Sequence, residues 1–477
     1  MAKHYGCFCV VEDRRREVLP LSHKMGLTMF LSCLLSLVMI SCSQPSPRSG
    51  EMTVFLDAYN DSCHRPYSGA IMVVQSGDIL LEDGYGMADH KTGTPNSPET
   101  VFAIGSITKS FTALGIMQLQ EQGLLSVHDP VNTYLEGYTR DDGVTLHHLL
   151  THTASLPREG LFRGSDPVSL DEQVEYINQR HMLFEAAPGE HYVYSNAGYI
   201  LLAAVIEQVS GQTYHEYMEE HILAPLGMNR SSSGTDTGLL PGQALGYDFS
   251  SGAPRLLSRY HFSSIVGSGN LYSTVEDLYK YHVGLQENSL LSETSTQELF
   301  SPHQGDGQDG YGYGWEITQL YGRQRFSHGG SIGNSGYKAL MIRYPTEDAV
   351  LIFLSNDEDH RPMFDVAESL EAILFQKPYV LPATTPPAPV DPVIVQSYAG
   401  SYQLPEGPVF HVRFEDGALY STADDGNDHR LIPLSDTRFY FENSPCVQAE
   451  FIQGAEGEKL QYRIQNKTRI FTGDLLQ

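Results

Sequence analysis

The sequence has 477 residues, a formal charge of −28, and a hydrophobic content of 41%. Its length predicts two or three folded units, because single cores stop growing at about 250–300 residues. The apolar content is typical of a globular protein and excludes a largely disordered chain. The negative charge argues against nucleic-acid binding, which needs a basic surface. Because the acidic residues are scattered, we interpret them as a solvated surface.

A leader precedes the folded part of the chain. Basic residues within 14–24 are followed by an uncharged stretch, GLTMFLSCLLSLVMIS, which ends at Cys42. A basic section followed by an apolar one is typical of a secretory signal, and this stretch is short for a membrane span. The letters MISC at its end resemble a lipoprotein cleavage box. We therefore predict a signal peptide over 1–41, lipid attachment at Cys42, and a flexible tether over 42–54.

Two alternatives stay open for the leader, an ordinary cleaved signal and an uncleaved anchor helix. The section before Met25 is long for the start of a signal, so translation could begin at Met1 or at Met25. Outside the leader and Cys42, the cysteines are Cys63 and Cys446, which could form a disulfide or remain two separate thiols. We expect an exported protein, lipid-anchored to a membrane and facing the periplasm or the exterior.

Residues 55–378 carry strand patterns at both ends and helical patterns between them. The first, AIMVVQSGDILLEDGYG at 70–86, predicts a hairpin. Helical spacing then runs from Ser106 to about Gln122 and stops at Gly123. Further helices are predicted over 171–180, 197–221, 273–285 and 363–375, and strands over 337–344 and 349–355. This order predicts an α/β sandwich, with one sheet built from both ends and a helical subdomain inserted.

The C-terminal part is separated by a proline-rich segment. The letters LPATTPPAPVDP fall in a predicted stiff linker over 379–392. Beyond the linker, residues 393–477 contain short segments of alternating polar and apolar residues. These segments predict a small β-barrel or sandwich.

Three short motifs occur in order in the central region: Ser106-Ile107-Thr108-Lys109, Tyr194-Ser195-Asn196 and His328-Gly329-Gly330. On a helix, residues three apart share a face, so Lys109 can reach the Ser106 hydroxyl. A second SxxK, Ser335 to Lys338, leads into a predicted strand, where such residues point to opposite faces. We therefore assign the chemistry to the first copy.

Ser106 has the properties of a nucleophile. It follows a loop and opens a helix, where free N–H groups and the helix dipole favour negative charge. A serine hydroxyl needs a base, and Lys109 can serve only if burial or nearby charge lowers its pKa from about 10.4. Tyr194 starts near 10 and would need a cationic neighbour to be a phenolate. We infer that Lys109 and Tyr194 share the proton of Ser106.

The three motifs resemble those of the serine β-lactamase and penicillin-binding superfamily. Stretches such as VFAIGSITKSFTALGIMQLQEQG, VTLHHLLTHTASLP and PGEHYVYSNAGYILL are similar to the class C β-lactamase branch with its D-peptidases and esterases. The resemblance spans about residues 65–360. It implies an acyl-enzyme at Ser106, proton transfer by Lys109 and Tyr194, and an amide contact from Asn196.

The same resemblance assigns the third motif and the C-terminal part. It implies that the backbone N–H groups of Ser106 and Ser331 form an oxyanion hole, and that His328 and Gly330 belong to the substrate-binding strand. The opening YAGSY of residues 393–477 resembles a lipocalin-like barrel that is appended to some members.

The third motif departs from true β-lactamases, which usually carry Lys-Thr-Gly where this chain has His328. An imidazole with a pKa near 6.5 thus replaces an ammonium group. The His form resembles the D-peptidases and esterases more than the antibiotic-destroying members. If protonated His328 holds a substrate carboxylate, activity on carboxylated substrates should fall as the pH rises above its pKa.

We therefore predict an exported serine hydrolase that acts on an amide or ester of a small molecule or peptide. A D-amino-acid peptidase, a carboxypeptidase and an esterase are the leading candidates. A β-lactamase and a slowly acylating penicillin-binding sensor are the alternatives. No cofactor and no metal are predicted, because no CxxC pair occurs and the HHLLTHT histidines, His147, His148 and His152, are interpreted as local packing. The oligomeric state stays open.

Overall fold

The computed structural model describes residues 47–476 apart from short gaps, at 63–64, 140–142, 163–165, 181–186, 235–237, 259–260, 306–308, 383–386, 406, 424–425, 427, 443, 454–459 and 467–468. The predicted signal peptide, Cys42 and Cys63 lie outside these residues, as does the side chain of Cys446. Over the described part of the chain, no helix combines the length and the apolar character needed to cross a bilayer.

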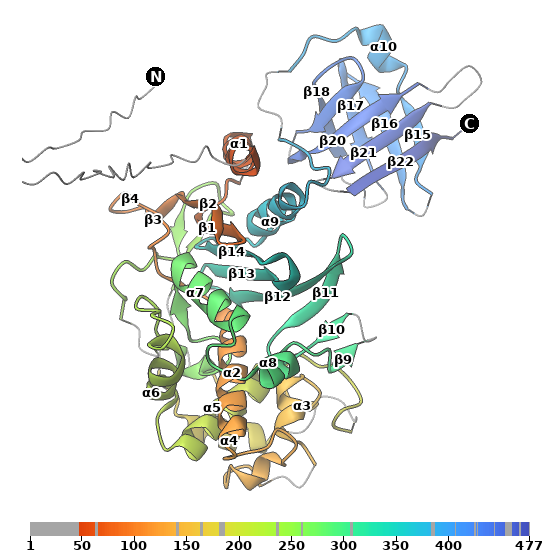
Figure 1. The fold of residues 1–477 in the computed structure, drawn as a ribbon. Helices are drawn as coiled ribbons and strands as arrows, with labels where there is room; N and C mark the ends of the chain where they lie inside the picture. The colour runs from red at the N-terminus through yellow and green to blue at the C-terminus, as the bar shows by residue number, and fades with distance from the viewer. Residues whose placement is uncertain are drawn as a thin grey trace, which may run out of the picture. The chain divides into compact units, whose positions relative to one another are not determined.

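One antiparallel eight-stranded sheet organises the N-terminal region (Figure 1), and its strand order is β2-β1-β14-β13-β12-β11-β10-β9. Two strands come from the start of this region and six from its end, so the sheet assembled from both ends is confirmed. Their bounds are β1 Gly69–Gln75, β2 Asp78–Tyr85, β9 Gln304–Gly305, β10 Gly310–Tyr311, β11 Glu316–Leu320, β12 Arg323–Ile332, β13 Tyr337–Tyr344 and β14 Ala349–Ser355. Short two-stranded pairs flank this sheet, formed by β3 Met87–Asp89 with β4 Thr94–Pro95, β5 Phe102–Ala103 with β8 Tyr272–Ser273, and β6 Tyr247–Asp248 with β7 Arg255–Leu256.

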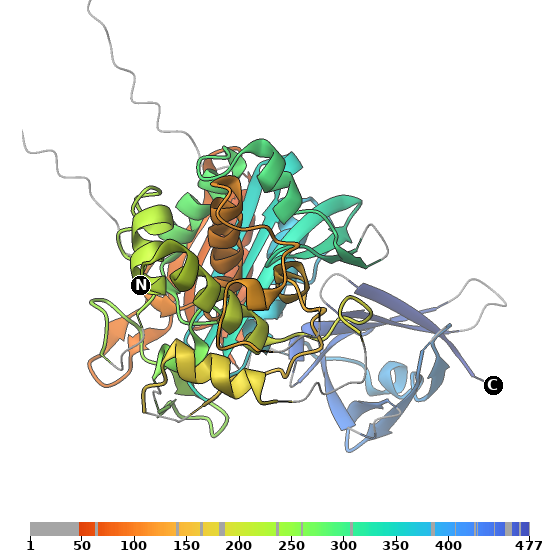
Figure 2. The same cartoon turned by 90° about the horizontal axis from the view of Figure 1, so that it is seen from below.

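Helices cover both faces of the large sheet, as the two views in Figures 1 and 2 show. Helices α1 (Pro47–Ser62) and α9 (Arg361–Leu374) share a core with one face. The other face packs against α2 (Thr108–Glu121) and α7 (Val275–Gln286). Because successive side chains of a strand point to opposite faces, β1 contributes Ala70 to one core and Ile71 to the other.

The predicted tether over 42–54 is wrong in its second half. Residues 47–54 belong to α1, and Met52 is fully buried. The cause is the spacing of Met52, Phe55, Leu56 and Tyr59, which places four apolar side chains on one helical face. That face packs into the core shared with α9, so the hydrolase region starts earlier than residue 55.

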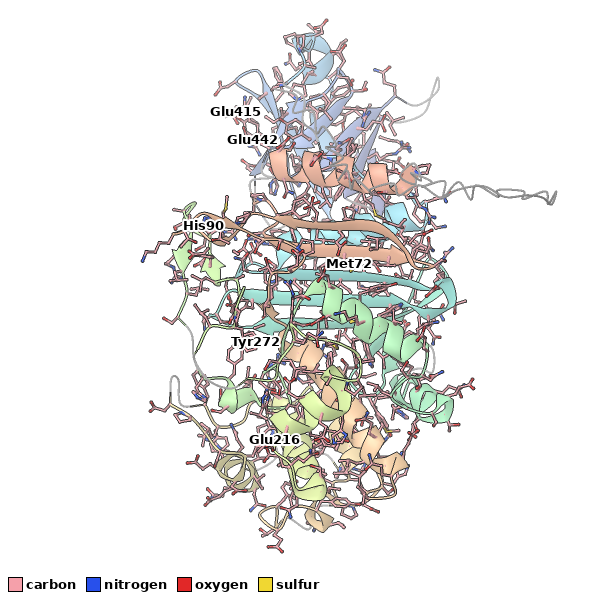
Figure 3. All side chains as sticks on the ribbon, turned by 60° about the vertical axis from the view of Figure 1, so that its left-hand side comes forward. Met72, His90, Glu216, Tyr272, Glu415 and Glu442 are labelled. Carbon is pink, nitrogen blue, oxygen red and sulfur yellow. The ribbon has the colours of Figure 1, made fainter. Side chains whose placement is uncertain are left out.

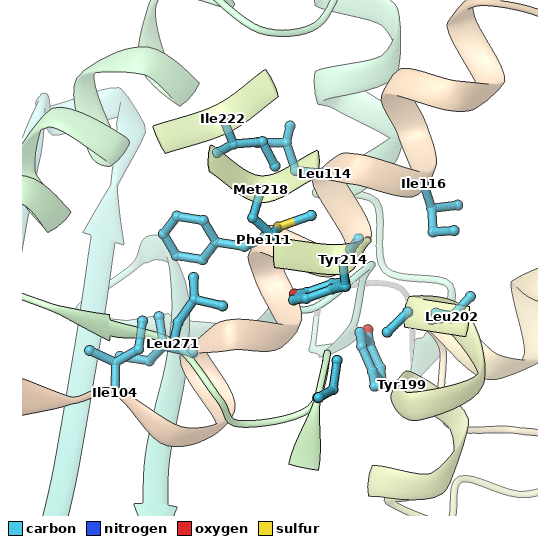
Figure 4. Close-up of a cluster of buried hydrophobic side chains, with 14 of the residues drawn as sticks. Ile104, Phe111, Leu114, Ile116, Tyr199, Leu202, Tyr214, Met218, Ile222 and Leu271 are labelled. Carbon is cyan, nitrogen blue, oxygen red and sulfur yellow. The ribbon is translucent and has the colours of Figure 1, made fainter. Parts of the chain in front are cut away.

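A helical subdomain fills the middle of the region, and Figure 4 shows part of its core, where Phe111 and Leu114 of α2 lie near Tyr214 and Met218. The helix predicted over 197–221 is interrupted. Gly211, with a φ of +72°, ends the first part, and Thr213 then caps a new helix. The helices are α3 Leu146–Leu150, α4 Leu170–Asn178, α5 Asn196–Ser210, α6 Tyr214–Met218 and α8 Glu293–Leu299.

The C-terminal region is a closed antiparallel barrel of eight strands, preceded by α10 (Pro392–Gln396). This outcome selects the barrel over the sandwich. Aromatic side chains fill its interior, where Tyr398 stacks on Phe451 at 4.2 Å between ring centroids. The strands are β15 Gly400–Gln403, β16 Val409–Glu415, β17 Ala418–Thr422, β18 Asp428–Pro433, β19 Arg438–Phe441, β20 Ser444–Ile452, β21 Gln461–Asn466 and β22 Arg469–Leu475.

Acidic side chains are exposed in both regions. Glu216 is exposed on the helical subdomain, and Glu415 and Glu442 are exposed on the barrel (Figure 3). The net charge is therefore spread over the surface and is not gathered in one segment, as the sequence predicted.

Candidate active site

Ser106 and Lys109 lie at the start of α2, one helical turn apart. Ser106 is in the 3-10 turn η1 (Gly105–Ile107), and α2 begins directly after it, at Thr108. The Lys109 Nζ atom lies 3.1 Å from the Ser106 Oγ atom. Lys109 is completely buried, whereas Ser106 is partly exposed. The structure thus joins the two residues that the first motif placed on one helical face.

The surroundings of Lys109 favour a neutral amine. Burial lowers the pKa of Lys109 well below its usual value; the Glu159 carboxylate opposes this change and the Arg158 guanidinium adds to it. The Nζ atom donates to Asn196 Oδ1 at 2.7 Å and to the Ser268 carbonyl at 2.8 Å. Both oxygens can only accept, and they leave the third position of Nζ facing Ser106 Oγ. When the amine is neutral its lone pair can occupy that position, which is the arrangement a general base requires.

Tyr194 approaches the same serine from the loop before α5. Its hydroxyl shares a hydrogen bond with Ser106, and its ring centroid lies 4.8 Å from Lys109 Nζ. Burial raises the pKa of Tyr194 above its usual value, while the bond with Ser106 and the Arg158 charge act in the opposite direction. The phenol therefore keeps its proton at neutral pH. In this geometry Lys109 can act as the base and Tyr194 as a neutral proton donor, and a phenolate is disfavoured.

Two glycines bring the turn of Ser106 against strand β12. Gly105 has a φ of +51°, and a Cβ atom there would lie 2.8 Å from the Ser331 backbone nitrogen. A Cβ atom at Gly330 would lie 2.0 Å from the Ile104 carbonyl oxygen. Only glycine allows this approach. It places the N–H groups of Ser106 and Ser331 on neighbouring segments, as an oxyanion hole requires.

A cavity of about 820 Å³ opens in front of Ser106. Strand β11 pairs with β12 only as far as Ser327, so the following stretch of β12 is not paired with β11. Residues 328–334 line the cavity along this stretch. The remaining lining includes charged residues (Arg158, Glu159, Glu316, Lys338) and apolar residues (Phe162, Ile265, Met363, Phe364).

His328 lines this cavity, but the structure argues against a charged imidazole. The residue is 2% exposed, and burial lowers its pKa to about 3, with the nearby Lys109 acting in the same direction. Its Nδ1 atom lies 2.8 Å from the Gly329 carbonyl oxygen and its Nε2 atom 3.0 Å from the Tyr311 hydroxyl. Both ring nitrogens are thus engaged. The expectation that protonated His328 holds a substrate carboxylate has no support in this geometry.

Several site residues escaped the sequence analysis. Ser268 contributes only its carbonyl oxygen, which no motif marks. Glu159 accepts from Asn196 Nδ2 at 2.8 Å, and its partner Arg158 lies 5.1 Å from the Tyr194 ring centroid. Arg158 and Glu159 follow directly on the stretch VTLHHLLTHTASLP, so their position could have drawn attention to them.

The three histidines of HHLLTHT separate into two places. His152 is buried beside Tyr194, with ring centroids 4.3 Å apart. His147 and His148 instead lie near His128, and Tyr313 bonds His147 at 2.8 Å. In the part of the chain that the structure describes, no three His, Cys, Asp or Glu side chains are arranged to hold a metal ion.

The arrangement can carry out acyl transfer. Lys109 can remove the proton of Ser106 as the oxygen attacks a carbonyl carbon, and the Ser106 and Ser331 N–H groups can receive the developing oxyanion. The neutral Tyr194 phenol can pass a proton to the leaving group. Water can then release the acyl group by the reverse path.

Comparison with known proteins agrees with this chemistry. Residues 55–374 match the Beta-lactamase family. Penicillin-binding protein 4* of Bacillus subtilis (strain 168) is 31% identical over 418 residues, which cover 82% of this chain and 92% of that protein. Teichoic acid D-alanine hydrolase of Staphylococcus aureus (strain MRSA252) is 29% identical over 260 residues, which cover 54% of this chain and 64% of that protein.

A solved structure shows the same fold. The octameric penicillin-binding protein homologue from Pyrococcus abyssi matches with a TM-score of 0.59 and 28% identity, over 85% of this chain and 95% of that one. Fold and site together define a serine hydrolase. The chain belongs to the Beta-lactamase family, as the resemblance of its three motifs implied.

Proposed function

We propose that the protein hydrolyses amides and esters whose acyl group is a D-amino acid and whose leaving group carries no charge. The observation that carries this proposal is the neutral His328. β-Lactams and the substrates of carboxypeptidases carry a carboxylate close to the scissile bond. A site that selects them needs a free cation there, because a buried charge must be paired.

The cationic groups of the cavity lining already face carboxylates. Arg158 Nε lies 3.4 Å from Glu159 Oε1, and Lys338 Nζ lies 3.3 Å from Glu358 Oε1. The lining also holds Glu316, whose pKa is raised by burial while the Arg325 charge acts in the opposite direction. An anionic group on the substrate would therefore meet a balanced or negative site, whereas a free α-ammonium group would meet a favourable one.

The proposed acyl group follows from the family relatives. The similarity to a protein named teichoic acid D-alanine hydrolase favours D-alanine as the acyl group. Teichoic acid itself is a polyanion, and this chain has a formal charge of −28. Long-range repulsion therefore favours a small or uncharged carrier of the D-amino acid over an anionic polymer.

The test compares substrates that differ in one charge. D-Ala-D-Ala and its C-terminal amide share every contact except the carboxylate. We expect kcat/KM to be at least about tenfold higher for the amide, since one unpaired buried charge is worth well over 1.4 kcal/mol. D-Ala p-nitroanilide should be hydrolysed and its L form should not, and Ser106→Ala should be inactive on all of them.

Three outcomes would contradict the proposal. Preference for the free carboxylate would identify a carboxypeptidase. Turnover of a penicillin at a rate above that of the D-alanyl amide would identify a β-lactamase. A stable adduct at Ser106, seen by intact mass without steady-state product, would identify a sensor.

We also propose that the protein is exported and carries lipid at Cys42. The order of basic and apolar residues before MISC supports this proposal. Expression of the full chain in a bacterium with labelled palmitate should label the wild type and not Cys42→Ala. Equal labelling of both, or recovery of both in the soluble fraction, would contradict it.

A further inference from the structure

A chain of four hydrogen bonds crosses the active site behind Ser106. The backbone N–H of Ser195 donates to His152 Nδ1 at 3.1 Å. The Nε2 atom of His152 lies 3.2 Å from the Tyr311 hydroxyl, which lies 3.0 Å from His328 Nε2. The Nδ1 atom of His328 lies 2.8 Å from the Gly329 carbonyl oxygen. The chain thus connects the second motif, next to Tyr194, with the third motif on β12.

The two ends of the chain, together with a neutral His328, determine the direction of every bond in it. A backbone N–H can only donate, so His152 Nδ1 accepts and its proton is on Nε2, which donates to Tyr311. A carbonyl can only accept, so His328 carries a proton on Nδ1; because burial lowers the pKa of His328, its Nε2 atom carries no proton and accepts from Tyr311. Both imidazoles are neutral and carry opposite tautomers. The tyrosine hydroxyl is the single group that satisfies both.

We propose that Tyr311 is a positioning residue whose hydroxyl aligns the two halves of the active site. Through His152 it holds the Ser195 peptide, and thereby the neighbouring Tyr194 phenol at Ser106. Through His328 it holds the Gly329 carbonyl, and thereby the strand that carries the Ser331 N–H. The inference goes beyond the proposed substrate class and does not depend on it.

Burial and neighbouring charge favour the neutral form of each side chain in this hydrogen-bond chain. Tyr311 is 3% exposed, and burial raises its pKa well above the usual value. Burial also lowers the pKa of His152 well below its usual value, and the Arg158 charge acts in the same direction. The groups that face the Tyr311 hydroxyl are Tyr192, Tyr194, Tyr199 and the Glu316 carboxylate. None of these groups is a cation that could take the place of the Tyr311 hydroxyl.

The same segment offers a matched control. Tyr313 lies two residues from Tyr311, is equally buried, and also bonds a histidine, with its hydroxyl 2.8 Å from His147 Nδ1. That histidine belongs to a group outside the cavity lining. Tyr311→Phe and Tyr313→Phe each remove one oxygen atom. The first variant loses two Tyr–His bonds, both in the chain, whereas the second loses one Tyr–His bond outside it.

The experiment measures kcat for an amide and for an activated ester of the same acyl group, normalised to the number of sites that a fluorophosphonate probe labels. Both substrates need the oxyanion contacts, but only the amide needs a proton on its leaving group. For Tyr311→Phe we expect kcat to fall on the order of 10²-fold for the amide and on the order of tenfold or less for the ester. A loss of this size is expected when a catalytic group is misplaced by about 1 Å. Tyr313→Phe should stay within about twofold of wild type on both.

Equal losses on amide and ester would assign Tyr311 a merely structural role and would overturn the proposal, as would wild-type kinetics. The full-length wild type supplies a second measurement that needs no variant. Imidazole ¹⁵N spectra should show neutral rings with opposite tautomers for His152 and His328 near neutral pH, and a cationic ring or equal tautomers would overturn the proposal. These results hold for any substrate that is turned over, so they are independent of whether the D-aminoacyl preference is confirmed.

Discussion

The protonation state of Lys109 can be tested by changing the charge of two residues that do not contact Ser106. Glu159 raises the pKa of Lys109 and Arg158 lowers it. The base is active when it is neutral, so kcat/KM falls as the pH drops below that pKa. Glu159→Gln should lower the pKa and move the acid limb of the pH profile to lower pH. Arg158→Gln should move the limb to higher pH.

The size of the change follows from the geometry. The bonds through Asn196, 2.7 Å to Lys109 and 2.8 Å to Glu159, place the carboxylate roughly 7 Å from Nζ. At that distance Coulomb's law gives about 0.6 kcal/mol in water and about 2.4 kcal/mol at an effective dielectric of 20. The Glu159 side chain is 59% exposed, so solvent screening favours the lower figure. The acid limb should therefore move by roughly half a pH unit.

The assay is the pH dependence of kcat/KM at low and at high salt, on one D-alanyl amide. The glutamine at position 159 keeps an oxygen that accepts from Asn196, so the variant changes the charge and little else. Both displacements should shrink at high salt, because exposed charges are screened. If the acid limbs of both variants moved in the same direction, or if neither limb moved, the assignment of Lys109 as the base would be refuted.

Two further predictions concern the framework of the site. Gly330→Ala should lose about 1–3 kcal/mol of stability and on the order of 10²-fold in kcat, because its Cβ atom would lie 2.0 Å from the Ile104 oxygen. The Cβ atom of Gly329→Ala would meet nothing within 4 Å, so this variant should keep the thermal stability of the wild type. Equal melting temperatures for Gly330→Ala and Gly329→Ala would contradict this account. Thr274 caps α7 by accepting from the Asp277 N–H at 3.1 Å, so Thr274→Ala should cost about 1 kcal/mol in urea unfolding. Thr274→Ser should restore most of the loss, and a failure to do so would assign the effect to packing.

Short-range patterns determined much of this fold from the sequence alone. The strands at 337–344 and 349–355 have the predicted bounds, and the helix of the first motif begins within two residues of its expected start. Such features depend on periodicity and on local stop signals, which a single segment contains. The tether predicted over 42–54 is wrong from residue 47 onward, because most of the apolar positions that define the helix over Pro47–Ser62 lie beyond residue 54. The helix break at Gly211 was not predicted, because the apolar pattern continues across that residue.

The sequence also determined which residue types meet at the site. Ser106 and Lys109 are joined by the local geometry of one helix, and the order of the three motifs indicated the family. Their protonation states were decided by the tertiary structure. Burial lowers the pKa of Lys109, and the Ser268 carbonyl and Asn196 that bond its Nζ atom come from distant parts of the chain. The pKa of His328 is lowered for the same kind of reason, because its ring is buried only in the folded protein, where its Nε2 atom meets the Tyr311 hydroxyl. A pKa depends on burial and on the charges and bonds around a group, and folding creates all of these.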